Sequence, residues 1–227
     1  MRALVRLVVV LAVLAALVGG AAAWMGVLQV PVLSASFGMD HPRDLGSAQP
    51  DEAAYASFSS RLGVKLPSPA ANYSFSSRHE FSGSVAVNET ISESTVLAIR
   101  EFQTDTPGFR DVSIRFHHGS AEAAAFIDLA PYGYPLSGPV YTSFRVAVAG
   151  PKRVTVTLDA LDFGRLGVPG DIRARAEDAL NGYLATRLAQ IDGLEVTTLA
   201  FRESAVTFAG SLPTTYQASP PQPGAMP

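Results

Sequence analysis

The chain has 227 residues, with 17 basic and 20 acidic side chains, a formal net charge of -3 and no cysteine. The lack of cysteine excludes disulfides, thiolate nucleophiles and cysteine-ligated metal sites. Phosphate binding needs a concentrated basic surface, so this mildly acidic chain with few Lys and Arg residues is not expected to bind nucleic acid.

The mean hydropathy of +0.21 is high for a soluble protein, and one N-terminal segment accounts for it. Residues 7–28 carry no charged or strongly polar side chain. As a helix they would span about 33 Å, enough for a hydrocarbon core of about 30 Å. Arg2 and Arg6 precede the segment and the next charge is Asp40, so the positive-inside rule places the N-terminus in the cytoplasm. The sequence therefore predicts a single-pass anchor at residues 1–28 in the cell membrane, with the rest of the chain extracytoplasmic.

A cleavable signal peptide is the alternative interpretation of this segment. Such a peptide has a basic start, an apolar region, here residues 7–18, and small residues at the cleavage site, such as Ala21 and Ala23. The apolar character continues past these alanines to residue 28, which favours an uncleaved signal anchor. Both interpretations place residues 29–227 outside the cytoplasm, and the Ala-, Arg- and Val-rich composition is typical of a bacterial protein.

The remaining chain divides into three parts. Residues 29–50 are expected to form a juxtamembrane linker, because apolar residues there give way to Ser, Gly, Asp, Pro and Gln. Residues 51–212 have the usual size of one domain with a single core. Residues 213–227 hold five prolines and no charge, so we expect a disordered tail.

The first elements of the domain follow from periodicity and capping signals. Apolar residues at helical spacing predict a helix at 50–62, and alternation predicts an extended strand at 73–87. A second helix should begin with a capping box, in which Thr90 caps the helix and Glu93 reaches back. Four alternating segments should then form an antiparallel meander of strands at 112–116, 123–129, 140–149 and 154–160.

The strongest helical signal is the amphipathic segment 171–191, with Asp171 as its expected cap and Gly193 as its stop. A closing hairpin of strands is expected at 194–201 and 206–210. Because the helix has one broad apolar stripe and the strands have one apolar face each, we expect an α+β fold in which a curved antiparallel sheet packs on this helix.

No group of residues predicts catalysis. His117 and His118 are adjacent on an expected strand, so they point to opposite faces and are not expected to share a metal ion. Ser120 lies nearby but without a G-x-S-x-G context. Asp162-Phe163-Gly164 spells a kinase motif without the Gly-rich loop that a kinase needs, and is interpreted as a turn at a strand end. We therefore expect no catalytic residue, no metal ligand and no cofactor.

Two regions are candidates for ligand binding. The loop at residues 130–139 presents Tyr132 and Tyr134, which with nearby Tyr141 would form a binding lip unless the loop is an ordinary connection. On the long helix, the small side chains of Ala176 and Ala179, beside Tyr183, would leave room for an apolar ligand between helix and sheet. Close packing of helix and sheet is the alternative.

Residues 163–194 contain a strand end, Gly167-Val168-Pro169, a long helix, and Gly193-Leu194 before another strand. With the N-terminal span and the meander, this order resembles the tubular lipid-binding superfamily, including mycobacterial envelope proteins of the domain-of-unknown-function type. The resemblance covers the order of elements in about residues 81–212 and no signature residue. It implies a curved sheet around a long helix, and lipid binding without covalent catalysis.

The leading expectation is therefore a membrane-anchored extracytoplasmic domain that binds a membrane lipid or another apolar ligand and is not an enzyme. The alternative is a structural or accessory subunit that docks on a larger membrane protein complex. An extracytoplasmic hydrolase is the third possibility, disfavoured by the lack of a convergent polar cluster.

Overall fold

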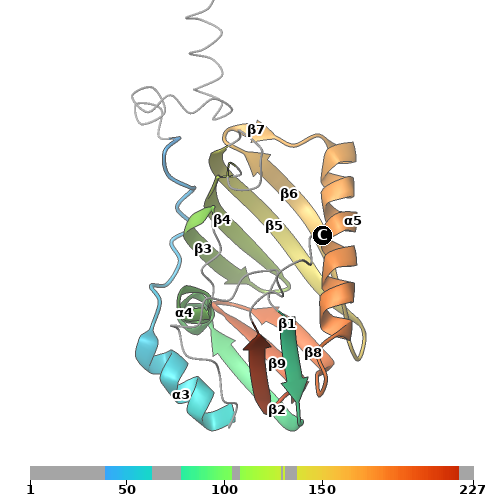
Figure 1. The fold of residues 1–227 in the computed structure, drawn as a ribbon. Coiled ribbons are helices and arrows are strands. Elements are labelled where there is room, and N and C mark those ends of the chain that lie inside the picture. The colour runs from blue at the N-terminus through green and yellow to red at the C-terminus, as the bar shows by residue number, and fades with distance from the viewer. Residues whose placement is uncertain (1–38, 63–77, 104–107, 129, 131–136, 220–227) are drawn as a thin grey trace, which may run out of the picture.

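The computed structural model of the protein describes residues 39–62, 78–103, 108–128, 130 and 137–219 (Figure 1). The elements are, in chain order, α3 (Glu52–Leu62), β1 (Arg78–Ser82), β2 (Val85–Ser92), α4 (Glu93–Gln103), β3 (Phe109–His117), β4 (Ser120–Asp128), β5 (Ser137–Gly150), β6 (Arg153–Phe163), β7 (Leu166–Gly167), α5 (Gly170–Ala189), β8 (Glu195–Arg202), β9 (Ala205–Leu212) and β10 (Thr215–Ser219). The strands form antiparallel sheets with the orders β3-β4-β5-β6-β7, β2-β9-β8 and β1-β10. The predicted α+β class with antiparallel strands is confirmed, but the strands divide among separate sheets.

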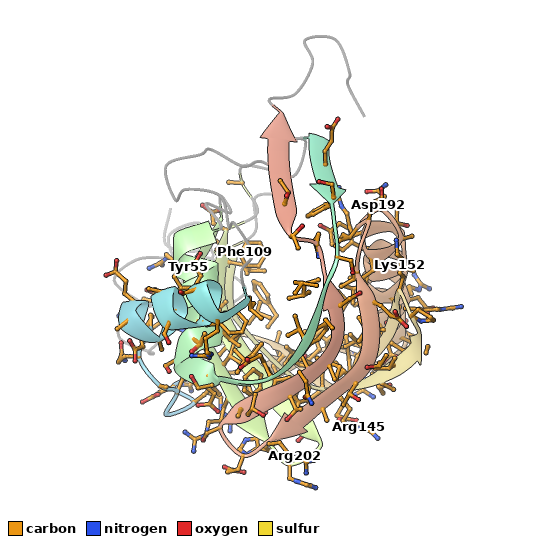
Figure 2. All side chains as sticks on the ribbon, turned by 90° about the horizontal axis from the view of Figure 1, so that it is seen from below. Tyr55, Phe109, Arg145, Lys152, Asp192 and Arg202 are labelled. Atoms are coloured by element: carbon orange, nitrogen blue, oxygen red, sulfur yellow. The ribbon has the colours of Figure 1, made fainter. Side chains whose placement is uncertain are left out.

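The core lies between the five-stranded and the three-stranded sheet. Phe116, Ala121 and Phe144 are direct neighbours across β3, β4 and β5, so their side chains share one face of the larger sheet. Phe201 of β8 packs on this face, with its ring centroid 5.2 Å from that of Phe116 and 5.8 Å from that of Phe144. A further cluster around Val154 extends the core to β6. Figure 2 shows side chains of both sheets converging on the space between them.

Helix α5 confirms the long predicted helix but corrects its packing. It ends before Gly193, whose φ of +79° favours glycine at the stop. The expected cap at Asp171 is wrong, because Pro169 occupies the N-cap and no side chain caps the helix. No residue of α5 is buried, and the helix lies along β6 at the side of the sheet (Figure 1). The expectation that the sheet covers the apolar stripe holds only at the C-terminal end, where Leu188 and Ile191 pack on the Val154 cluster, whereas Ile172 and Tyr183 are exposed.

The start of α4 also differs from the prediction. β2 continues through Ser92 in its pairing with β9, so Thr90 belongs to a strand and caps no helix. The Ser92 hydroxyl oxygen instead accepts the Thr95 N–H at 3.3 Å. Glu93 does not reach back, and its carboxylate contacts β3. Strand pairing has thus overridden the local capping signal.

The two ends of the described chain also differ from expectation. Residues 215–219, part of the expected disordered tail, form β10, which pairs with β1. Residues 39–46 of the expected linker run along β3, where Arg110 donates to the Asp40 carbonyl oxygen at 3.5 Å and Arg115 to that of Gly46 at 2.8 Å. The predicted anchor at residues 1–28 lies outside the described residues, and among those described no helix is long and apolar enough to cross a membrane.

Candidate functional site

Helix α5 contacts β6 through a row of polar side chains spaced four residues apart. Arg173 Nη1 donates to the Asp159 carbonyl oxygen at 2.7 Å, and Glu177 Oε2 accepts the Leu158 N–H at 2.8 Å. The Asn181 side chain accepts the Val156 N–H at 2.7 Å and donates to the Val156 carbonyl oxygen at 2.8 Å. β7 pairs with β6 only at Asp162 and Phe163, so this stretch of β6 has no strand on its outer side. The row of Arg173, Glu177 and Asn181, here called the polar row, occupies the place of an edge strand.

The use of polar side chains at this contact leaves an apolar face of α5 exposed. Ile172, Leu180 and Tyr183 are 51%, 36% and 44% exposed, and Ala176 and Ala179 lie on the same face. At 100° per residue, this face is centred about 115° around the helix from the polar row. We call these five residues the α5 apolar stripe. The structure therefore brings the predicted ligand residues Ala176, Ala179 and Tyr183 together, but not against the β6 edge, where hydrogen bonds fill the contact.

The five-stranded sheet carries a second apolar surface beside α5. Ala125, Val140 and Phe163 are direct neighbours in register, as are Ala123, Thr142 and Leu161, and both rows share the face that bears the core. All six side chains are half-buried, and none belongs to a core cluster of the described residues. We call these residues the β4–β6 apolar face. The face ends at β6, along which α5 runs.

Of the tyrosines of the expected binding lip, the structure describes Tyr141, which does not contribute to this surface. Tyr132 and Tyr134 lie outside the described residues. Tyr141 pairs with Ala124 and Asp162, so it points to the opposite face from Val140. There its hydroxyl donates to Glu122 Oε1 at 2.6 Å, and Arg43 lies 4.5 Å above its ring. Tyr141 is therefore engaged in polar contacts on the face opposite the β4–β6 apolar face.

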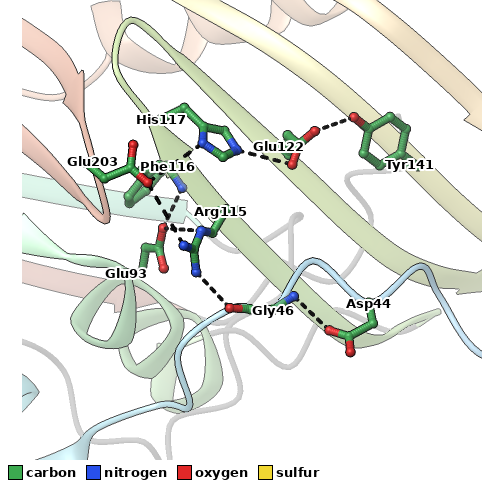
Figure 3. A network of polar contacts seen from close by, with 9 residues as sticks. All are labelled: Asp44, Gly46, Glu93, Arg115, Phe116, His117, Glu122, Tyr141 and Glu203. Carbon is green, nitrogen blue, oxygen red and sulfur yellow. Dashed lines mark hydrogen bonds and ion pairs between the residues drawn. The ribbon is translucent and has the colours of Figure 1, made fainter.

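Tyr141 belongs instead to a polar network that sequence reasoning missed (Figure 3). His117 Nε2 lies 3.3 Å from Glu122 Oε2, and its Nδ1 lies 3.9 Å from Glu203 Oε1. Glu203 is in the β8–β9 turn, so the network joins two hairpins of different sheets. His118 is exposed, as expected, but His117 is not a free turn histidine. Its two partners lie in separate hairpins, and no local sequence pattern relates them.

Hydrogen bonding and burial shift the pKa values of Glu122 and Tyr141. The pKa of the Glu122 carboxyl lies below its ordinary value, chiefly because the Tyr141 hydroxyl donates to it, with His117 acting in the same direction against burial. Burial raises the pKa of the Tyr141 hydroxyl, and Glu122 raises it further. A carboxylate held ionised in this way is a hydrogen-bond acceptor and an ion-pair partner. These contacts connect strands and the segment that bears Arg43, which indicates a structural role.

Replacement of Tyr141 by phenylalanine is expected to raise the pKa of Glu122 toward its ordinary value of about 4.3. A depressed pKa stabilises the fold above the unfolded-state pKa, and that stability is lost as pH falls through the folded-state pKa. The acid-dependent loss of stability should therefore be smaller in Tyr141→Phe. NMR titration of the Glu122 carboxyl carbon checks this prediction, with Tyr183→Phe as the control that leaves the pKa unchanged. An unshifted titration in Tyr141→Phe would contradict it.

The motifs examined for chemistry have ordinary structural places. β6 ends at Phe163, and Gly164, with a φ of +61°, begins the turn to β7, so Asp162-Phe163-Gly164 is a strand-end turn as expected. Over the described ranges, no three His, Asp or Glu side chains are placed to hold a metal ion. The α5 apolar stripe and the β4–β6 apolar face are the strongest candidates for a functional site in the same ranges.

Comparison of the sequence with models of known protein families finds no match, and a search of curated proteins finds no significant relative.

Proposed function

We propose that this protein is a membrane-anchored extracytoplasmic domain that binds a lipid or another apolar ligand and carries out no reaction. The observation that carries this proposal is the exposed α5 apolar stripe. Exposed contiguous apolar surface marks a site for a ligand, a partner or a membrane. The apolar segment at residues 7–28 supports the anchor.

The dimensions and composition of the surface suit an elongated apolar ligand. From Ile172 to Tyr183 the stripe is about 17 Å long, at 1.5 Å per residue. Complete burial of an isoleucine or leucine side chain contributes about 1.5 to 3 kcal/mol. Because Ile172 and Leu180 are 51% and 36% exposed, covering them would add a fraction of this value each to a binding free energy. The β4–β6 apolar face adds half-buried apolar side chains on the sheet along which the helix runs.

The accessory subunit remains the second candidate, and the same stripe supports it. Ala176 and Ala179 are small and lie between larger apolar residues. Small side chains permit close approach of a second helix, in water or in a membrane. In this alternative a helix of a partner protein covers the stripe and no lipid is retained.

Native mass spectrometry of the full chain, extracted from membranes in mild detergent, distinguishes these functions. For the ligand function we expect lipid adducts on the wild-type protein and their loss in Ile172→Ser/Tyr183→Ser. Asp178→Ser, on an exposed polar part of the same helix, is the matched control and should retain the adducts. Lipid-free protein in a stable complex with a second polypeptide would support the subunit. Protein that is always alone and free of lipid would contradict both.

A further inference from the structure

Large apolar side chains are exposed at one end of the five-stranded sheet. Phe109, Leu166 and Ile172 are 43%, 39% and 51% exposed. Phe109 pairs with Ile127 at the start of β3, and Leu166 pairs with Phe163 at the end of β6, so the two lie at the same end on opposite edges of the sheet. Ile172 is in the first turn of α5, next to that end.

The chain enters the described domain at this same end. Asp40 lies there, because Arg110, the neighbour of Phe109, donates to its carbonyl oxygen. From Asp40 the chain runs along β3 toward Gly46, away from this end (Figure 1). Residues 29–38 separate the apolar segment 7–28 from residue 39, and ten residues reach at most about 36 Å. A bilayer that holds residues 7–28 therefore lies at most about 36 Å from residue 39. Residue 39 precedes Asp40, which lies at the same end of the sheet as Phe109, Leu166 and Ile172.

We propose that this end of the sheet, here called the β6–β7 end, faces the lipid bilayer, and that Leu166, Ile172 and Phe109 insert their side chains into its interfacial region. The proposal rests on the membrane anchor of the proposed function. Its occupant is the bilayer that anchors the chain, and burial of the three side chains in it supplies the favourable free energy.

The charges at the β6–β7 end indicate how it would associate with lipid. Arg110 and Arg165 are accompanied by Asp111, Asp128 and Asp171, so the end has no basic excess. Attraction to anionic headgroups needs clustered Lys and Arg residues and weakens as salt screens it. Association through apolar side chains should instead be insensitive to salt.

The absence of cysteine permits a direct test on the full chain in liposomes. Single-cysteine variants Leu166→Cys and Ile172→Cys, labelled with an environment-sensitive fluorophore, are compared with His118→Cys. His118 is exposed in the β3–β4 turn, at the opposite end of the sheet. Blue-shifted emission and quenching by doxyl-labelled lipid are expected at residues 166 and 172, and neither at residue 118. The quenching should be equal in phosphatidylcholine and anionic liposomes and unchanged by added salt.

Flotation of the same samples on a density gradient separates the possible failures. Protein that floats with the liposomes while all three labels report water would overturn the orientation and leave the anchor intact. Protein that stays at the bottom of the gradient would overturn the anchor and the orientation together. A further variant carries the label at Phe109→Cys together with Leu166→Asp and Ile172→Asp. It tests whether quenching depends on the two apolar side chains and not on the fluorophore itself. Quenching at residue 109 should fall in that variant, and unchanged quenching would contradict insertion of Leu166 and Ile172.

Discussion

Replacement of Glu93 by alanine is expected to lower the free energy of unfolding by about 3 kcal/mol. Glu93 is 2% exposed, and its Oε1 accepts the N–H of Phe116 at 2.6 Å and lies 3.8 Å from Arg115 Nε. Removal of the carboxylate leaves a buried N–H without its acceptor and Arg115 without its nearest charge. A hydrogen bond to a charged group contributes about 1.5 to 3 kcal/mol, and an orphaned buried donor adds a penalty.

Glu93→Gln is the matched control, because its side-chain oxygen still accepts the Phe116 N–H while the charge is removed. We expect a loss of about 1 kcal/mol in this variant, clearly smaller than in Glu93→Ala. Urea unfolding followed by far-UV circular dichroism measures both values. Circular dichroism is preferable to tryptophan fluorescence, because the single tryptophan, Trp24, lies outside the described domain. Equal losses in the two variants would contradict the role of the hydrogen bond.

Replacement of Asn181 by alanine is expected to lower the free energy of unfolding by about 2 kcal/mol. The Asn181 side chain satisfies both backbone groups of Val156, a residue that is 6% exposed. Each lost hydrogen bond removes about 1 kcal/mol of stability, and the unpaired groups of β6 add to the loss unless water reaches them. The amide hydrogen of Val156 should also exchange faster with solvent, which hydrogen exchange by NMR measures.

Asp178→Ala is the control for this change, because it is on the same helix and its side chain is exposed. A surface substitution of this kind should change stability by no more than about 0.5 kcal/mol. A similar loss in both variants, or unchanged exchange at Val156, would show that α5 does not depend on the polar row for its position.

Glu93 and Asn181 serve the same purpose at opposite sides of the sheet. β3 is one edge of the five-stranded sheet, and there Glu93 accepts the Phe116 N–H while the Ser204 N–H donates to the Phe116 carbonyl oxygen at 3.1 Å. β6 lies near the other edge, where the polar row of α5 satisfies the backbone. Side chains and a turn of other elements thus occupy backbone groups of β3 at Phe116 and of β6 at Val156 that a foreign strand would otherwise use for pairing.

The positions of β3 to β6, β8 and β9 were predicted well because the alternation of apolar and polar residues along a strand is a local property of the sequence. Alternation of apolar and polar residues placed β3, β4, β5 and β6 within a few residues of their observed bounds, and the closing hairpin matched β8 and β9. The long helix was equally clear from its length and from Gly193 at its end. The apolar segment 7–28 is likewise a property of the sequence alone, and with it the prediction of an anchored chain.

Features that depend on partners distant in the sequence were predicted wrongly or were missed. Ser92, Glu93 and Thr90 fit a capping box, but the pairing of β2 with β9 extended the strand to Ser92 and released Glu93 to bind β3. Residues 215–219 lie in the uncharged, Pro-rich segment expected to be disordered, yet β1 pairs with them. The His117 network likewise joins hairpins that no sequence spacing relates.

The sequence by itself determined the α+β class, the strands β3 to β6, β8 and β9, and an apolar stripe on the long helix that includes Ile172, Ala176, Ala179 and Tyr183. Only the tertiary structure showed that β1 and β2 replace the single strand expected at 73–87, that residues 215–219 form β10, and where the stripe on α5 points. Periodicity reports that one side of a helix is apolar, but the packing of the helix depends on which side finds the better partner. Here the open backbone of β6 needed hydrogen bonds, and Arg173, Glu177 and Asn181 supplied them from the side of α5 that also packs Leu188 on the core. Ile172, Leu180 and Tyr183 therefore remain exposed on another side of the helix.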